Sequence, residues 1–391
     1  ERLLAERLEK KRIEAEQHQI EHITTATAAS TTDITKSIFR KTLTTVAARS
    51  ISKLGSLLTK DSLDPLSLKT GQDSADQQLT ANKQRQRGEW DLAVQTYTVA
   101  LATNPQDASL YLNRGLAKEQ QGNFESALED YNKAIQINPL DTGAYIARAS
   151  SFSILGDKNS ALSDYSRAIQ LSPLNETARM RRAEILSEQG DKQQAISDYS
   201  VILRTNPGNI AALYARADLR VDSGYREDAI EDYNKILISQ PTHAAALFKR
   251  GRLRDEIGDK AGALEDYTRS IQVNRKQANA YNNRGIIRAN LGDMAGALSD
   301  YTMAIQLQPT LTSAYNNRAA SLATAGRHLA AINDYTTAIR LNPNYAAAYA
   351  NRGLAYEAIN EIRLACNDWR KASQLGDNQA QQWALAQCSR N

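Results

Sequence analysis

The chain has 391 residues and carries 48 Lys and Arg against 44 Asp and Glu, a net charge of +4 at pH 7. This near balance argues against a dedicated nucleic-acid binder, and no apolar run approaches the length of about 18 residues that a membrane-spanning helix needs. Two Cys are too few for a disulfide framework or a four-thiolate zinc site. The 17 Tyr against 4 Phe and 3 Trp indicate that tyrosine is placed by a repeating rule.

Residues 1–73 are predicted to form a helical arm. Residues 1–22 have the pattern of a charged helix, in which His18 and His22 are expected to be a solvated pair rather than a metal site. Residues 23–33 are expected to be a loop, and residues 34–60 are predicted as an amphipathic helix with six basic and no acidic residues. The candidate contact residues of this helix, for assembly or for a membrane surface, are Ile34, Ile38, Phe39, Arg40, Lys41, Val46, Arg49, Lys53 and Leu54.

Proline, tyrosine and glycine recur every 34 residues after this arm, beginning with Pro105, Tyr97 and Gly88. Within each period, small and aromatic residues follow helical spacing, a glycine is placed to end a first helix, and a proline to end a second one. A helical hairpin with one uncovered face must stack on its neighbours, so an all-α solenoid is predicted. Nine units without insertion or deletion fill residues 74–379, and they start at residues 74, 108, 142, 176, 210, 244, 278, 312 and 346.

The second unit shows the pattern with Tyr111, Gly115, Ala127, Tyr131 and Pro139. This pattern strongly resembles the tetratricopeptide repeat family, whose 34-residue unit has large, small, Ala, aromatic and Pro residues at these positions. The resemblance implies a right-handed superhelix with a concave groove that the first helices line. It also implies a scaffold that binds peptides or proteins, not an enzyme. The sequence has no catalytic constellation and no Gly-rich phosphate loop, so no cofactor is expected.

The chain departs from the family at the seventh position of the unit, where eight units have Arg in place of the usual Leu. The residue before the core aromatic is Asp in the same eight units, whereas the first unit has Thr80 and Thr96 at these two places. Because the two charges are lost together, pairing within a unit is predicted. A ladder of partly buried ion pairs that sets register is preferred over a row of ligand-binding arginines. The predicted pairs include Arg114 with Asp130, Arg148 with Asp164 and Arg284 with Asp300.

By the same resemblance, the second, fifth, sixth and ninth positions face a ligand. The clamp with which chaperone-binding members recognise a free C-terminal carboxylate needs Lys and Asn at the fifth and ninth positions. Such recognition is not expected here, because the fifth position carries Leu112, Ile146, Met180, Tyr214 and Phe248. Asparagines near the sixth position resemble the ladder of sugar-transferase repeat domains, in which amides hold a peptide backbone, and merely solvated side chains are the alternative. These candidates are Asn113, Asn282, Asn283, Asn316, Asn317 and Asn351.

The middle of the predicted groove combines apolar residues, such as Tyr214 and Phe248, with an excess of acidic ones. Such a surface suits a basic amphipathic helix, and ordinary surface charge is the alternative. Residues 34–60 of the same chain or of a neighbour are one candidate for that helix, and head-to-tail docking that does not close would give filaments. The acidic residues are Glu184, Glu188, Asp218, Asp222, Asp255 and Glu256, against Arg181, Lys249 and Arg252.

The C-terminal stretch around Cys366 and Trp369 resembles a terminal unit common in bacterial members of the family. Residues 380–391 are predicted as a cap, with a helix over 378–388 whose Trp383 and Leu385 cover the last exposed face. Cys366 and Cys388 are expected either to form a disulfide in an oxidising compartment or to be two buried thiols in a cytosol. An extracytoplasmic location is slightly favoured over a cytoplasmic one.

Three functions remain open at this point. The first is a scaffold whose groove binds a peptide or a helix of another protein. The second is a structural protein that self-assembles through its N-terminal helix into a homo-oligomer or filament. The third, an auxiliary domain of a larger enzyme, requires further sequence upstream of Glu1. The expected partners are therefore proteins or peptides, including copies of the chain itself, with no nucleic acid, no metal and membrane contact only through residues 34–60.

Overall fold

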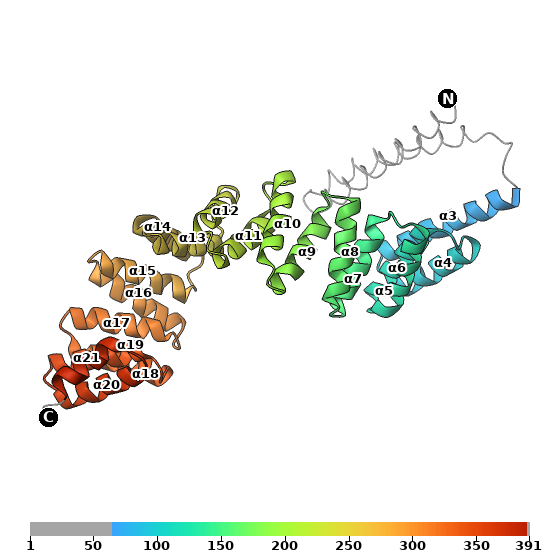
Figure 1. Cartoon of the computed structure of the whole chain (residues 1–391). Coiled ribbons are helices and arrows are strands. Elements are labelled where there is room, and N and C mark those ends of the chain that lie inside the picture. Colours follow the sequence, from blue (N-terminus) through green and yellow to red (C-terminus); the bar gives the residue numbers. More distant parts are fainter. Residues whose placement is uncertain (1–64, 389–391) are drawn as a thin grey trace. The chain divides into compact units, whose positions relative to one another are not determined.

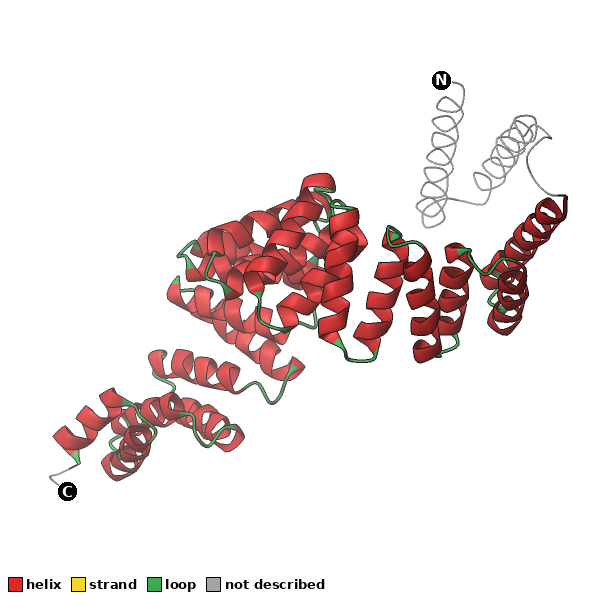
Figure 2. Ribbon diagram, turned by 45° about the vertical axis from the view of Figure 1, so that its right-hand side comes forward, coloured by secondary structure: helices red, strands yellow, loops and turns green. Residues whose placement is uncertain are grey.

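The computed structural model describes the backbone of residues 65–388 and the side chains from residue 73 onward. The helices predicted over 1–22 and 34–60 lie outside the described residues. Within the described part, helices alternate with short loops (Figure 2). Their bounds are α3 Pro65–Gln86, α4 Trp90–Thr103, α5 Ala108–Gln120, α6 Phe124–Ile137, α7 Thr142–Ile154, α8 Lys158–Leu171, α9 Glu176–Glu188, α10 Lys192–Thr205, α11 Ile210–Asp222, α12 Arg226–Ser239, α13 Ala244–Glu256, α14 Lys260–Val273, α15 Ala278–Asn290, α16 Met294–Leu307, α17 Thr312–Thr324, α18 His328–Leu341, α19 Ala346–Ala358, α20 Ile362–Gln374 and α21 Asn378–Gln387.

The chain divides into two compact units, residues 1–110 and residues 111–391, which are described separately. In the first unit, α3 packs against α4. Tyr97 of α4 is fully buried, and its hydroxyl donates to Asn82 Oδ1 of α3 at 2.6 Å. Because α3 begins at Pro65, it extends upstream of residue 74, where the first repeat is predicted to start.

In the second unit, each helix from α6 onward packs against the helix that follows it (Figure 1). The first helices α7 to α19 begin at residues 142, 176, 210, 244, 278, 312 and 346, and the second helices α6 to α20 begin at residues 124, 158, 192, 226, 260, 294, 328 and 362. Both series advance by 34 residues, so every repeat places a given side chain at the same point of the hairpin.

The turn inside each hairpin needs one residue with a left-handed backbone. Glycine takes this place in most repeats, for example Gly122 with φ of 80° and Gly292 with φ of 83°. The ninth repeat has Asn360 there, with φ of 65°. Asparagine tolerates this region better than most other L-residues, so the turn survives the loss of glycine.

The turn that leaves each hairpin has an extended residue before the proline. Asn138, which precedes Pro139, has φ of −126° and ψ of 89°, as expected for a residue whose helical conformation the following proline disfavours. Asn274 precedes Arg275 and has φ of −132° and ψ of 99°. The turn therefore keeps its geometry without proline.

The core of each repeat is the aromatic side chain of the second helix, packed on a small residue of the first helix. Tyr131 is fully buried, and a Cβ added to Gly115 would lie 2.5 Å from its Cε1 atom. A Cβ on Gly285 would lie 2.7 Å from Tyr301 Cε1 in the same way. The two helices approach closely at this point because the first helix lacks a side chain there.

The tyrosine hydroxyl explains why this core position is not phenylalanine. The Tyr131 hydroxyl donates to Glu119 Oε2 at 2.8 Å, and the Tyr233 hydroxyl donates to Asp218 Oδ1 at 2.5 Å. The ring thus fills the gap between the two helices while its polar tip reaches the first helix. A buried hydroxyl needs such a partner, which accounts for the repeated pairing.

Candidate binding surface

Arginine and aspartate form a ladder through the second unit. Arg148 Nε lies 2.7 Å from Asp164 Oδ2, and its Nη2 lies 2.8 Å from Asp164 Oδ1, so the pair is bidentate. The hydrogen bond to Asp164 is the main cause that raises the pKa of Arg148 above its ordinary value. The same two contacts recur within each repeat for Arg114–Asp130, Arg182–Asp198, Arg216–Asp232, Arg250–Asp266, Arg284–Asp300, Arg318–Asp334 and Arg352–Asp368.

Each of these arginines from Arg148 onward also reaches the preceding repeat. Arg250 Nη1 donates to Asn234 Oδ1 at 2.6 Å, and Arg352 Nη1 donates to Thr336 Oγ1 at 2.9 Å. The donors are therefore occupied on both sides, and the ladder is structural. The second contact was not predicted from the sequence, although the residue after each core tyrosine from Tyr131 to Tyr335 is one that can accept it: Asn132, Ser166, Ser200, Asn234, Thr268, Thr302 and Thr336.

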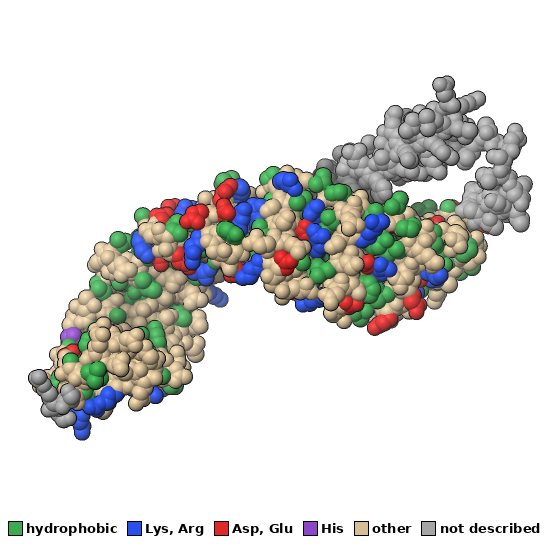
Figure 3. All heavy atoms as spheres, in the orientation of Figure 1, with side chains coloured by type: hydrophobic (Ala, Val, Ile, Leu, Met, Phe, Trp, Pro, Cys, Tyr) green, Lys and Arg blue, Asp and Glu red, His purple; other side chains and the backbone are tan. Residues whose placement is uncertain are grey.

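The fifth and sixth positions of α5 to α19 carry the candidate ligand contacts, and we call their side chains the first-helix row. The fifth position is aliphatic or aromatic as far as Phe248, and then changes to Asn282 and Asn316. On the face drawn in Figure 3, charged side chains are frequent over α9 to α13 and sparse from α15 onward. The row consists of Leu112, Asn113, Ile146, Ala147, Met180, Arg181, Tyr214, Ala215, Phe248, Lys249, Asn282, Asn283, Asn316, Asn317, Ala350 and Asn351.

Four asparagines of the row form one hydrogen-bonded chain across two repeats. Asn316 Nδ2 donates to Asn317 Oδ1 at 3.3 Å, and Asn317 Nδ2 donates to Asn282 Oδ1 at 3.0 Å. The chain continues from Asn282 Nδ2 to Asn283 Oδ1 at 3.2 Å and from Asn283 Nδ2 to the Tyr267 hydroxyl at 3.4 Å. Asn282 and Asn316 are buried, whereas Asn283 and Asn317 are half-buried, as are Asn113 and Asn351.

The acidic excess predicted for the middle of the row is absent, because every acidic residue there has a basic partner. Four of the partners come from second helices, which the count from sequence did not include. Exposed pairs of this kind contribute little stability, but they cancel the local field. The pairs are Glu184–Arg181 at 3.0 Å, Glu188–Lys158 at 2.8 Å, Asp218–Lys249 at 2.6 Å, Asp222–Lys192 at 3.5 Å, Asp255–Lys260 at 2.5 Å and Glu256–Arg226 at 3.1 Å.

Tyr214 and Lys249 lie at the centre of the row. The Tyr214 ring packs edge-on against Tyr233, with 5.9 Å between centroids, and Lys249 Nζ lies 4.8 Å from the Tyr214 centroid. Asp218 accepts from both Lys249 and the Tyr233 hydroxyl. Burial is the main cause that raises the pKa of Tyr233 well above its usual range, so this hydroxyl stays protonated and donates. The centre of the row is thus a half-buried aromatic surface beside an internally paired cation.

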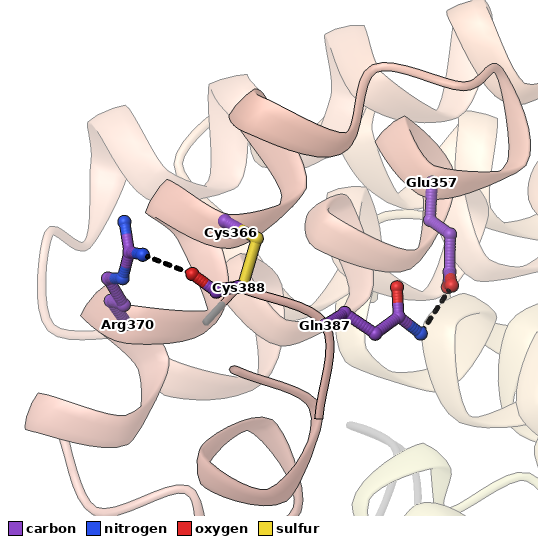
Figure 4. Close-up of a disulfide and its surroundings, with 5 residues drawn as sticks. All are labelled: Glu357, Cys366, Arg370, Gln387 and Cys388. Carbon is purple, nitrogen blue, oxygen red and sulfur yellow. Dashed lines mark hydrogen bonds between the residues drawn. A yellow bond between two sulfur atoms is a disulfide. The ribbon is translucent and has the colours of Figure 1, made fainter. Parts of the chain in front are cut away.

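The two cysteines lie at the C-terminal end of the second unit. Cys366 of α20 and Cys388, the C-cap of α21, form a disulfide (Figure 4). Trp383 of α21 packs on the fully buried Trp369 with 5.9 Å between centroids. Leu385, by contrast, is 70% exposed, so it does not cover the last face as the sequence analysis expected.

The remaining predictions from the sequence concern the N-terminal arm, metal sites and membrane-spanning helices. The candidate contacts between Ile34 and Leu54 lie outside the described residues. Among residues 65–388, no group of three or more His, Cys, Asp and Glu side chains is placed to hold a metal ion. No helix in that part of the chain is both long and apolar enough to cross a membrane.

The stacked helical hairpins make the described part an α-solenoid. Family comparisons match profiles described as tetratricopeptide repeat over residues 84–151 and over residues 146–210, 214–272 and 250–311, and one described as TPR repeat over residues 322–360. The matches together span more than half of the chain, which therefore belongs to the tetratricopeptide repeat family. No protein with a curated description matches the sequence.

Solved structures of other repeat proteins are similar to this chain. A tetratricopeptide repeat protein from Parabacteroides merdae is 26% identical, with a TM-score of 0.46, over 62% of this chain and 97% of that one. MamA is also 26% identical, with a TM-score of 0.39, over 42% of this chain and 96% of that one. The C-terminal part of a TPR repeat-containing protein from Cytophaga hutchinsonii is 14% identical, with a TM-score of 0.53, over 61% of this chain and 98% of that one. This last likeness supports the fold.

Proposed function

We propose that this chain is a protein-interaction scaffold whose first-helix row binds a segment of a partner protein. The observation that carries the proposal is the asparagine chain of α15 and α17, in which the amides of Asn283 and Asn317 are partly exposed. A scaffold of stacked repeats gains its binding surface from side chains repeated along successive units. On α15, α17 and α19 the sixth position of the row repeats an uncharged, partly exposed asparagine, namely Asn283, Asn317 and Asn351.

The asparagines suit the main chain of a peptide. A carboxamide offers both a donor and an acceptor, so it pairs with any peptide group whatever the side chain. Asn283 Nδ2 now donates to the Tyr267 hydroxyl at 3.4 Å, and Asn317 Nδ2 donates to Asn282 Oδ1 at 3.0 Å. A bound peptide replaces these contacts with its own amide and carbonyl groups, so the exchange leaves few unpaired groups on either side.

The apolar part of the row adds selectivity for side chains. Met180, Tyr214 and Phe248 are half-buried and follow each other on α9, α11 and α13. Half-buried aromatic and methionine side chains are typical anchors of protein interfaces. The flanking acidic and basic residues are already paired, so the partner segment needs no strong charge of its own.

Selection from a library of random peptides tests the proposal. Purified full-length protein should enrich peptides that lose at least tenfold in affinity for the double variant Asn283→Ala/Asn317→Ala. Asn333→Ala is the matched control, because Asn333 is an exposed asparagine of the second helix α18. Failure to enrich any peptide, or equal binding to the double variant, contradicts binding at the row.

Self-assembly through residues 34–60 is the competing function. The charge argument for it is weakened by the pairing of Glu188, Asp222 and their neighbours with second-helix cations. Light scattering of the full chain and of a deletion of residues 1–60 separates the two functions. Self-assembly is supported if only the full chain forms a particle larger than a monomer. If both proteins are monomers, self-assembly is contradicted and the scaffold function is retained.

A further inference from the structure

Helix α21 stands where the first helix of a tenth repeat would begin. Trp383 follows Tyr349 by one 34-residue period, and it packs on the core Trp369. Gln382, however, is exposed, whereas Ala348, one period earlier, is fully buried. Apart from Leu385, the large exposed side chains of α21 are polar, namely Asn378, Gln379, Gln381 and Gln382, so this helix closes the array instead of continuing it.

The C-terminal end of α21 has three anchors (Figure 4). These are the Cys366–Cys388 disulfide, a hydrogen bond of 3.1 Å from Arg370 Nη2 to the Cys388 carbonyl, and one of 2.7 Å from Gln387 Nε2 to Glu357 Oε1. Only Ala380 is buried among residues 378–387. A helix of ten residues is below the length of about 12 to 15 at which isolated helices become stable. The docking of α21 thus depends on its anchors, and the covalent one is the strongest.

Cys366 replaces an aliphatic side chain. In the seven preceding repeats, the position corresponding to Cys366 holds a leucine or an isoleucine, which cannot form a covalent cross-link. The ninth repeat is the only one of these eight in which a covalent bond to the next helix can form by oxidation and break by reduction. The corresponding residues are Leu128, Leu162, Ile196, Ile230, Leu264, Leu298 and Ile332.

We propose that Cys366 and Cys388 form a thiol–disulfide exchange site, whose reduction by a small dithiol releases α21 and uncovers Trp369 at the end of the repeats. One thiolate of the dithiol attacks a cysteine sulfur and forms a mixed disulfide, and the other cysteine leaves as a thiolate and takes up a proton. The second thiol of the reductant then displaces the first cysteine. Two electrons and two protons pass to the cysteines, and the reductant becomes a cyclic disulfide.

Access to the bond is gated by the last turn of α21. Cys366 is 5% exposed and Cys388 is 6% exposed, so a reductant reaches the sulfurs only when that turn opens. The Gln387–Glu357 hydrogen bond holds the turn closed. The site therefore reacts slowly in the docked state, and loss of the cross-link shifts the docking equilibrium of α21 by on the order of a hundredfold.

Hydrogen exchange and tryptophan quenching of the Trp90→Phe variant test the proposal. This substitution leaves Trp369 and Trp383 as the only fluorophores of that type. After reduction by dithiothreitol, verified by the mass of two alkylated cysteines, exchange of residues 378–388 should rise by on the order of a hundredfold, and acrylamide should quench Trp369. Exchange of residues 278–345 should stay unchanged.

Two variants make the result specific. Cys366→Ser/Cys388→Ser should show the fast exchange of α21 without any reductant. Gln387→Ala should speed reduction several-fold, whereas Gln381→Ala, an exposed residue of the same helix, should not. The proposal is overturned if the reduced chain protects α21 as well as the oxidised one does, or if reduction unfolds residues 278–345 as well.

Discussion

Arg250 shows how one side chain ties two repeats together. Its Nε and Nη2 bind Asp266 of its own repeat, and its Nη1 donates to Asn234 of the repeat before. The planar guanidinium offers these donors in fixed directions, which the ammonium of lysine cannot reproduce. The arginine thus sets the register between repeats at a position where leucine would only fill space.

Replacing this arginine should be costly in a way that a surface lysine is not. Asp266 is fully buried, and Arg250→Met leaves it with Arg254 alone, so we expect a loss of about 3 kcal/mol in unfolding free energy. The control is Lys235→Met, which breaks an exposed pair with Glu231 and should cost less than about 1 kcal/mol. Urea denaturation followed by circular dichroism measures both.

The double variant Arg250→Met/Asp266→Leu separates register from stability. If the pair chiefly sets register, removing both charges should restore most of the stability that the single variant loses. A double variant as unstable as Arg250→Met would show that the ion pair itself stabilises the fold.

Each helical hairpin depends on one residue in its turn that adopts the left-handed backbone conformation. Gly292 and its counterparts adopt positive φ without cost, whereas Asn360 adopts φ of 65° with a side chain present. The chain then folds back by hydrogen bonds such as Glu361 N–H to the Tyr356 carbonyl at 2.9 Å. The turn between α19 and α20 is therefore the one described hairpin turn in which the conformational preference of an L-residue matters.

Substitution of Asn360 should follow this preference. Asn360→Ala should destabilise the chain by about 1 kcal/mol, because alanine disfavours the left-handed region, and Asn360→Gly should be neutral or slightly stabilising. Asn333→Ala, in the exposed face of α18, should change stability by less than about 0.5 kcal/mol. Thermal unfolding measures the three variants, and equal effects of Ala and Gly at residue 360 would contradict the argument.

At the scale of the whole molecule, the sequence shows what lies within a repeat better than what lies between repeats. The period of 34 marks the helices because no insertion shifts it, and the joint loss of charge at Thr80 and Thr96 points to the pairing of Arg with Asp. Contacts across a boundary, such as Lys158 with Glu188 over a separation of 30 residues, depend on how two repeats stack. The acidic excess predicted from first helices alone was wrong for that reason.

The asparagines show the same limit at the candidate site. Their spacing predicts that they line successive first helices, but spacing does not show how their side chains turn. Asn317 and Asn282 bind each other across the repeat boundary at 3.0 Å, which sequence could not reveal because the two residues are 35 positions apart. The same sequence is compatible with asparagines that are open to a ligand and with asparagines that bind one another. Only the geometry of stacking between repeats distinguishes these two arrangements.

The repeated tyrosine core makes the stability of the whole array sensitive to alkali. Burial is the main cause that raises the pKa of Tyr165, Tyr199, Tyr267 and Tyr301 to about 12, against about 10 in an unfolded chain. A raised pKa in the folded state favours the neutral form, so the stability from these groups is complete below pH 10 and is lost between pH 10 and 12. Linkage gives a loss on the order of 2 to 3 kcal/mol for each tyrosine over this window.

A titration that records tyrosinate absorbance and helical circular dichroism together tests this prediction. The buried tyrosines should ionise only as the helices unfold, so the rise in their tyrosinate absorbance should coincide with the loss of helical signal. Tyr267→Phe removes one ionisable group from the core and should move unfolding to higher pH, whereas Tyr225→Phe should not. Ionisation of the buried tyrosines near pH 10 with the helices intact would show that burial does not control these groups, because each buried hydroxyl would then reach water in the folded chain.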